Sequence, residues 1–260
     1  MNLGLQGRRA IVTGGSKGLG FAIAHELVQE GAHVAICSRN EDEVQDAAEE
    51  LRREGVTVYA QRADVTDAEQ VRDFVTRAAG ALGGIDALVN NAGRAHPGTF
   101  ETLSDEDWIG DLEVKLLSSV RCSREVLPHL RAAGGGRIVN IGAIQGRAPD
   151  PAFFATSVNR AAGNSFTKTL ALDVAKDNIL VNGVNIGFVI TPQWDNIHRR
   201  RAPELGRDEF LQSLADAEVP LRRFGTPDEV SGIVTFLLSD RASYITGASI
   251  DVAGGMGRYV

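Results

Sequence analysis

Short apolar runs alternate along this chain with longer segments whose apolar positions recur every three or four residues. The short runs fit buried strands of a parallel sheet, and the longer segments fit the helices that cross between them. The pattern therefore predicts an α/β fold with a doubly wound parallel sheet of seven strands and helices on both faces. The expected strands are 9–13, 33–37, 57–60, 85–90, 136–142, 179–184 and 247–252. The expected helices are 18–30, 40–54, 67–82, 104–132, 152–176 and 227–238.

The predicted elements follow one another without a linker, a repeat or a low-complexity tract, so residues 1–260 are expected to form a single domain. Residues 191–220 are the exception, because they follow a strand and carry no strong strand pattern. Ligands of doubly wound sheets bind beyond the carboxyl ends of the strands. We expect a helical insertion here that covers a substrate, with a solvated surface helix as the alternative. For Arg199–Arg201 alone, a solvated surface is favoured.

Composition excludes several classes of function. A formal net charge of -7 argues against a general nucleic-acid surface, because phosphate binding needs a concentrated basic face. Cys37 and Cys122 both lie in apolar stretches, which favours buried thiols over a disulfide or a metal site. The chain contains no apolar run of membrane-spanning length and no signal peptide. A soluble cytoplasmic protein without membrane or nucleic-acid partners is expected.

A glycine-rich turn links the first predicted strand to the first helix, in the order Thr13, Gly14, Gly15, Ser16, Lys17, Gly18, Leu19 and Gly20. Backbone without side chains can approach a pyrophosphate there, at a helix N-terminus whose free amides favour anions. The second strand ends in Ser38 and Arg39 rather than in a carboxylate. A guanidinium suits the 2′-phosphate of NADP(H), and Lys17 adds positive charge.

These motifs, together with Asn90-Asn91-Ala92-Gly93, resemble the short-chain dehydrogenase/reductase family, and the resemblance covers nearly the whole chain. It implies a Rossmann-like fold and NADP(H) as the cofactor. It also implies a homodimer or homotetramer assembled through the helices at 104–132 and 152–176. By the same resemblance, Asn90 steadies the central sheet and the remaining motif residues touch the cofactor. Those residues are Gly14, Ser16, Lys17, Gly18, Leu19, Gly20, Ser38, Arg39, Asp64, Val65, Asn91, Ala92, Gly93, Arg160, Ile190 and Thr191.

The second half of the chain departs from the family pattern. The family uses an Asn, a Ser and a Tyr-x-x-x-Lys pair, and the matching positions here hold Lys115, Ala143, Thr156 and Arg160. Thr156 cannot replace the tyrosine as an acid, because an aliphatic hydroxyl ionises near the pKa of water, about 15.7. Arg160 can hold ribose hydroxyls but cannot give up a proton. We therefore expect ordinary carbonyl reduction to be slow and the active site to be non-standard.

Two other groups are candidates for the missing acid. Lys115 serves if its ammonium faces the cleft, with a solvent-facing lysine as the equal alternative. His96 follows the fourth strand at the correct end of the sheet, although an incidental loop histidine is the simpler interpretation. Phe153, Phe154 and Trp194 could line a site for an apolar or aromatic small molecule, with core packing as the alternative.

Three functions stay open from the sequence. The favoured one is an enzyme that catalyses a cyclisation, dehydration, lyase or isomerase step, because Lys115 and Arg160 could stabilise an oxyanion or enolate. The second is an NADPH-dependent carbonyl reductase with a replacement proton donor. The third is a catalytically silent NADP(H) sensor or partner subunit.

Overall fold

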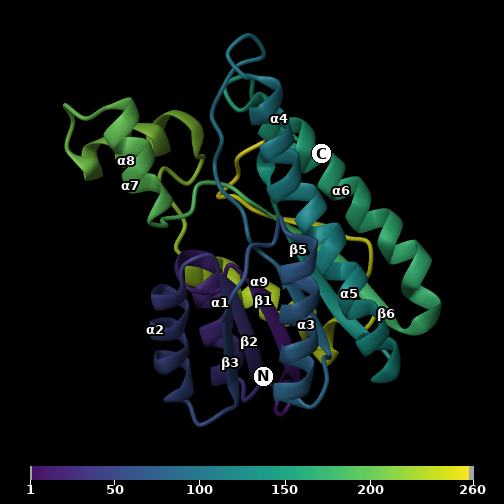
Figure 1. Cartoon of the computed structure of the whole chain (residues 1–260). Coiled ribbons are helices and arrows are strands. Elements are labelled where there is room, and N and C mark those ends of the chain that lie inside the picture. The colour runs from purple at the N-terminus through teal and green to yellow at the C-terminus, as the bar shows by residue number, and fades with distance from the viewer. Residues whose placement is uncertain (1, 258–260) are drawn as a thin grey trace.

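The computed structural model describes residues 2–257 and shows a parallel sheet of seven strands (Figure 1). The strand order is β3-β2-β1-β4-β5-β6-β7, so the chain starts in the middle of the sheet and winds outward in both directions. The predicted α/β fold is confirmed. The strands are β1 (Arg9–Thr13), β2 (His33–Ser38), β3 (Val58–Arg62), β4 (Ala87–Asn90), β5 (Gly136–Ala143), β6 (Ile179–Ile186) and β7 (Ser249–Val252).

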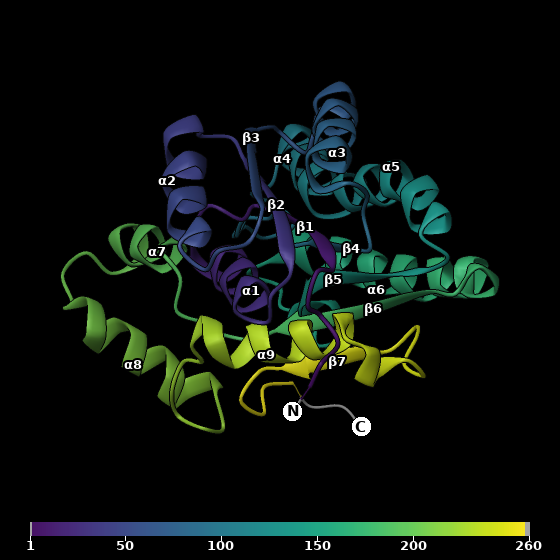
Figure 2. The ribbon, with the colours of Figure 1, turned by 90° about the horizontal axis from the view of Figure 1, so that it is seen from below.

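Helices cover both faces of the sheet, as Figures 1 and 2 show. Helices α1, α2 and α9 pack on one face, and α3, α5 and α6 pack on the other. The helices are α1 (Gly18–Gln29), α2 (Glu41–Arg52), α3 (Ala68–Leu82), α4 (Asp105–Leu112), α5 (Ser118–Ala132), α6 (Phe154–Val174), α7 (Gln193–Arg201), α8 (Arg207–Glu218) and α9 (Pro227–Leu238). Short 3₁₀ turns stand at Ile144–Gly146, Ala175–Asp177 and Asp240–Ala242.

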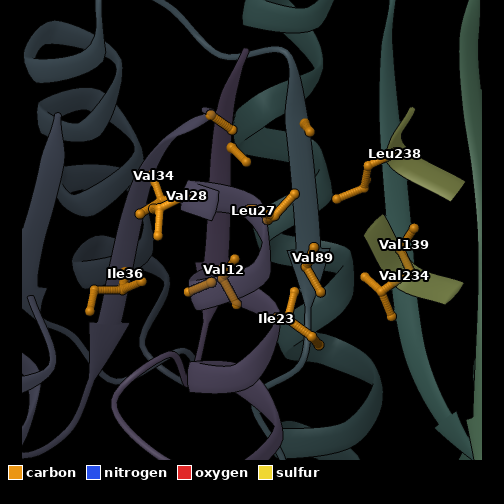
Figure 3. Packing of buried hydrophobic residues seen from close by; sticks show 14 of the residues in the cluster. Val12, Ile23, Leu27, Val28, Val34, Ile36, Val89, Val139, Val234 and Leu238 are labelled. Carbon is orange, nitrogen blue, oxygen red and sulfur yellow. The ribbon is translucent and has the colours of Figure 1, made fainter. Parts of the chain in front are cut away.

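Two apolar layers hold the sheet between its helices. In Figure 3, Ile23 and Leu27 of α1 lie near Val12 and Val89 of the central strands, and Val234 of α9 lies near Val139 of β5. The second layer lies on the opposite face and includes Cys37 and Cys122, which are both free thiols in the core. Cys37 and Cys122 are therefore structural, as the sequence indicated. Burial raises the pKa of the Cys37 thiol to about 12, so it stays protonated at neutral pH.

The prediction of one continuous helix at 104–132 is wrong in one respect. Helix α4 ends at Leu112, a π-helical turn occupies Glu113–Leu117, and α5 continues from Ser118. One extra residue in a helical turn rotates the following side chains about the axis, and such bulges occur often at functional sites. Lys115 lies within this turn and is buried, with 3% of its surface exposed. Periodicity in the sequence does not reveal such a turn, because it shifts the pattern by a single residue.

Residues 191–220 form the expected helical insertion, built from α7 and α8. It has its own small core, in which Trp194 packs edge-on against Phe188 and Phe224 at centroid distances of 5.0 and 4.8 Å. The indole of Trp194 is therefore a core side chain of the insertion rather than a wall for substrate. None of the helices described between residues 2 and 257 is long and apolar enough to cross a membrane.

Candidate functional site

The glycine-rich turn leaves the start of α1 open to an anion. Lys17 precedes the helix, makes no side-chain cap, and no acidic residue follows in the first turn. Helix α2, in contrast, is capped by Asn40 and begins with three acidic residues. Free amides at an uncapped helix start need an acceptor and attract negative charge. The backbone of this turn therefore fits a pyrophosphate.

Close packing fixes the shape of this turn. Gly14 and Gly18 have φ values of +65° and +56°, in the region that favours glycine. A Cβ atom on Gly20 would stand 2.1 Å from the carbonyl oxygen of Gly14, so only glycine fits there. The Asn91 amide donates to the carbonyl oxygens of Thr13 and Gly14 at 2.9 and 3.2 Å. The backbone amides of Asn91 and Ala92 both donate to Thr13 Oγ1, which joins β4 to the turn.

Other predicted cofactor residues surround this turn. Thr191 lies in van der Waals range of Gly18, since a Cβ atom on that glycine would meet it at 3.5 Å. Ile190 is 39% exposed beside it. Asp64 orders its own loop, because its carboxylate accepts from the amide and the hydroxyl of Thr66, and Val65 is buried. The structure thus brings the ends of β1, β3, β4 and β6 to the same edge of the sheet.

The end of β2 presents a guanidinium. Arg39 is exposed, and Ser38 Oγ donates to the carbonyl oxygen of Asn40 at 2.9 Å. Arg62, which the sequence analysis missed, ends β3 opposite Ser38 and donates to the carbonyl oxygen of Arg39 at 3.2 Å. Only strand pairing places these two arginines together. The ammonium of Lys17 pairs with Glu43 at 2.8 Å, so an anion bound there would compete with that carboxylate.

A buried polar cluster joins the π-helical turn to α6. Lys115 Nζ donates to Thr156 Oγ1 at 2.5 Å and also contacts the carboxylate of Asp111. The second oxygen of Asp111 accepts from Asn159 Nδ2 at 2.9 Å. Lys115, Thr156 and Asp111 are 3%, 6% and 0% exposed, so the structure settles the direction of the Lys115 side chain in favour of the interior.

The surroundings of Lys115 bring the pKa of its ammonium close to neutral pH. Burial lowers the pKa of its ammonium to about 8, the Asp111 carboxylate opposes that change, and the positive charges of Arg160 and Arg94 add to it. A lysine with this pKa is mostly protonated at pH 7 and can both give and regain a proton. The ordinary lysine, with a pKa of about 10.4, is a much weaker acid.

Arg160 lies beneath the loop that follows β4. Its NH1 donates to the carbonyl oxygen of Ile141 at 2.7 Å, and its NH2 lies against Gly93. Burial lowers the pKa of Arg160 to about 10, so the guanidinium stays charged at neutral pH. Ala143 is the last residue of β5, and its side chain is only a methyl group.

His96 reaches the cluster through its backbone. Its carbonyl oxygen accepts from Thr156 Oγ1 at 3.4 Å, while its imidazole Nε2 lies 3.1 Å from the carboxylate of Asp107. The aromatic side chain of Phe154 packs against Phe100 and Trp108 at the outer end of α6. Within residues 2–257, no group of three His, Cys, Asp or Glu side chains could hold a metal ion.

Asp111 and Asn159 were not predicted from the sequence. A usable signal existed, because Asp111 stands four residues before Lys115, and residues at that spacing share a helix face. Asn159 stands three residues after Thr156 on α6 and shares its face in the same way. Their meeting across two helices is a tertiary contact, which no local pattern shows.

Comparisons with known proteins agree with this architecture. The model of a family described as enoyl-(acyl carrier protein) reductase matches residues 14–257. This chain belongs to the short-chain dehydrogenase/reductase family. The human protein called dehydrogenase/reductase SDR family member 4 is 35% identical over 253 residues, which cover 96% of this chain and 88% of the human one.

Two solved structures of the family are similar along the whole length. L-sorbose reductase from Gluconobacter frateurii, complexed with NADPH and L-sorbose, is 37% identical with a TM-score of 0.97 and full coverage of both chains. An NADPH-bound short chain oxidoreductase from Pseudomonas aeruginosa PAO1, described as containing an atypical catalytic center, is 35% identical with a TM-score of 0.91. That comparison covers 97% of this chain and 98% of the other.

Proposed function

We propose that this protein is an NADPH-dependent carbonyl reductase whose proton donor is Lys115. The observation that carries the proposal is the buried ammonium of Lys115 at 2.5 Å from Thr156 Oγ1. Lys115, Ala143, Thr156 and Arg160 stand where the family has Asn, Ser, Tyr and Lys. On this interpretation the site is non-standard. The family's acid is a tyrosine at the position of Thr156 on α6, whereas the acid here is Lys115 on the π-helical turn that contacts α6.

Several features support NADP(H) as the cofactor. The uncapped start of α1 suits the pyrophosphate, and the guanidiniums of Arg39 and Arg62 suit the 2′-phosphate. The family relatives with bound NADPH point the same way. Ile190 and Thr191 at the end of β6 would border the nicotinamide, and Arg160 would hold the ribose hydroxyls. NADPH bound there supplies a hydride to the carbonyl carbon.

The protein's own part is the proton. Thr156 Oγ1 receives a hydrogen bond from Lys115, and its own bond to the His96 carbonyl is long, at 3.4 Å. A substrate carbonyl oxygen beside Thr156 would therefore attract the hydroxyl hydrogen in place of His96. As the alkoxide forms, Thr156 passes its proton to that oxygen and takes one from Lys115. The lysine ends neutral, which its pKa of about 8 makes accessible.

The α7–α8 segment is suited to cover this site. Gln193 at the start of α7 accepts a hydrogen bond from the backbone amide of Ala95 at 2.7 Å, which ties the insertion to the loop after β4. That loop also carries the His96 carbonyl. We infer that residues 191–220 close over bound substrate and exclude water from the hydride-transfer step.

A homodimer or homotetramer is also part of the proposal. Ile109 on α4 and Val158 and Leu172 on α6 are 59%, 48% and 71% exposed, which leaves apolar area on the helices expected to associate. Sedimentation velocity of the full chain tests this: one monomer species at all concentrations would contradict it.

A redox-neutral reaction is the second candidate, because Lys115 and Arg160 would also stabilise an enolate in a cyclisation, dehydration, lyase or isomerase step. A silent NADP(H) binder is the third. The test is anaerobic single-turnover absorbance of NADPH with stoichiometric protein and a panel of ketones, aldehydes and keto acids.

The reductase predicts substrate-dependent loss of the NADPH band, slowed about 10²–10⁴-fold in Lys115→Met. The exposed Lys176→Met is the matched control and should leave the rate unchanged. Tight NADPH binding with no oxidation across the panel would exclude the reductase. Products formed without oxidation would then favour the redox-neutral enzyme, and their absence would favour the silent binder.

A further inference from the structure

The side chains around Lys115 carry more positive than negative charge. Lys115 and Arg160 are both in the polar cluster, and only the Asp111 carboxylate offsets them. Three carboxylates nearby in the chain are engaged elsewhere, and one of them, Glu113, pairs with Arg121. Asp107 pairs with His96, and Asp150 accepts from the backbone amide of Ala152 in its own loop. Among the described residues, Lys115 and Arg160 therefore share the single carboxylate of Asp111.

Unsatisfied donors border the same region. Arg160 Nε and Asn164 Nδ2 are buried and have no hydrogen-bond partner within residues 2–257. Both residues line a small cavity beside Lys115, together with Ser119 and Asn140. A buried donor without an acceptor is unfavourable, because it has lost its hydrogen bonds to water. Unsatisfied donors and positive charge therefore lie together beside Lys115.

Arg94 adds a further cation on the open side of the cluster. It lies one residue beyond Gly93, against which Arg160 NH2 packs. Its guanidinium leans toward α4, since its NH2 would lie 3.5 Å from a Cβ atom on Gly110. The side chain is exposed and makes no hydrogen bond or ion pair with any described residue. The charge on Arg94 reaches Lys115, because it helps to lower the pKa of that lysine.

A bound cofactor would not remove this excess. The residues suited to the phosphates lie at β1, β2 and the start of α1, whereas the cations gather around β5, α6 and the loop after β4. The nicotinamide ring is neutral when reduced and positive when oxidised. A substrate that carries a carboxylate would supply the compensating anion.

We propose that the substrate is an organic acid: a carbonyl compound whose carboxylate binds between Arg94 and the Lys115–Arg160 pair. The inference rests on the proposed function, since it names the substrate class of the same site. Arg94 is the specificity residue, because it is free to rotate and its planar fork fits a carboxylate. Lys115 and Arg160 are already engaged, so they contribute mainly charge.

The test is isothermal titration calorimetry of the full chain in low-chloride buffer, with and without NADP⁺. The probes are acetate, propionate and benzoate, each matched with its neutral amide. The acids should bind at least 10-fold more tightly than the amides. Arg94→Gln should remove most of that preference and leave the amides unchanged. Arg53→Gln is the matched control, because Arg53 is an exposed arginine at the end of α2, and it should change nothing.

Three results would overturn the inference: acids and amides of equal affinity, no acid binding up to 100 mM, or an acid preference that survives Arg94→Gln. The titration without NADP⁺ keeps this outcome separate from the proposed function. Loss of NADP⁺ binding, or a failure to oxidise NADPH, would count against the reductase and not against the acid site. Acid binding that fails in a chain that does oxidise NADPH would count only against the acid site.

Discussion

The carboxylate of Asp111 controls how much of Lys115 is protonated, and Asp111→Asn tests this directly. Two unit charges about 4 Å apart interact by about 4 kcal/mol at an effective dielectric constant of 20, which corresponds to about 3 in pKa. Removing the negative charge should therefore lower the pKa of Lys115 from about 8 to roughly 5–6. At pH 7 the acid would then be mostly deprotonated.

The assay is kcat/KM for NADPH-dependent reduction between pH 5 and 9. In the unmodified protein the rate should be constant below about pH 7 and fall as pH rises through about 8, because the reaction needs the protonated lysine. In Asp111→Asn the fall should come at roughly pH 5–6, which makes the variant about 10–100-fold slower at pH 7 and nearly restores it at pH 5.

Glu113→Gln is the control, because Glu113 lies in the same π-helical turn as Lys115 but its carboxylate pairs with Arg121. It should leave the pH profile in place. An Asp111→Asn profile with the original midpoint, or a loss of rate equal at every pH, would contradict this role of Asp111. The first result would mean that the carboxylate does not set the ionisation of Lys115. The second would mean that Asp111 only holds the helix.

Three further predictions follow from single contacts. Arg39→Ala should weaken NADPH binding about 10–100-fold and leave NADH binding unchanged, because a charged hydrogen bond contributes about 1.5–3 kcal/mol; a fluorescence titration measures both, and equal losses would contradict the 2′-phosphate assignment. Gly20→Ala should abolish NADPH binding through the clash with the Gly14 carbonyl, whereas Gly80→Ala, whose Cβ would meet nothing within 4 Å, should not. The folded chain holds Lys115 at a pKa of about 8 and the unfolded chain at about 10.4, so the unfolded state binds more protons between these values and stability rises with pH there. That gain should reach roughly 3 kcal/mol and be missing in Lys115→Met; urea unfolding at pH 7.5 and 10.5 checks it, and an identical rise in both proteins would disprove it.

Local patterns predicted the sheet well. The short apolar runs located all seven strands, and α9 spans Pro227–Leu238, the range predicted for the last helix. The errors in the predicted ranges lie at the ends of elements, where side chains contact residues that are far away in the sequence. Strand β4 starts at Ala87 rather than residue 85, and the carboxylate of the preceding Asp86 accepts from the backbone amide and the guanidinium of Arg9. Such ends depend on partners 77 residues away, beyond the reach of a local pattern.

The candidate site divides in the same way. The glycine turn is local in sequence and was predicted from it, whereas the need for glycine at position 20 follows from the structure, where a Cβ atom would clash with the Gly14 carbonyl oxygen. The direction of Lys115 was not, because it depends on the π-helical turn and on a carboxylate buried beside it. Packing of α4, α6 and the loop after β4 brings together three residues that are far apart in the sequence, Asp111, Asn159 and Arg94. Their roles are therefore visible only in the folded structure.

The most direct test of the central claim follows the hydride itself. The protein is mixed with NADPH deuterated at C4 on the transferred side and with a keto acid that consumes the cofactor, and the product is analysed by mass spectrometry. The product should carry one deuterium on the carbinol carbon and should form about 10²–10⁴-fold more slowly with Lys115→Met. A product without deuterium, or an equal rate in the variant, would contradict the proposed function.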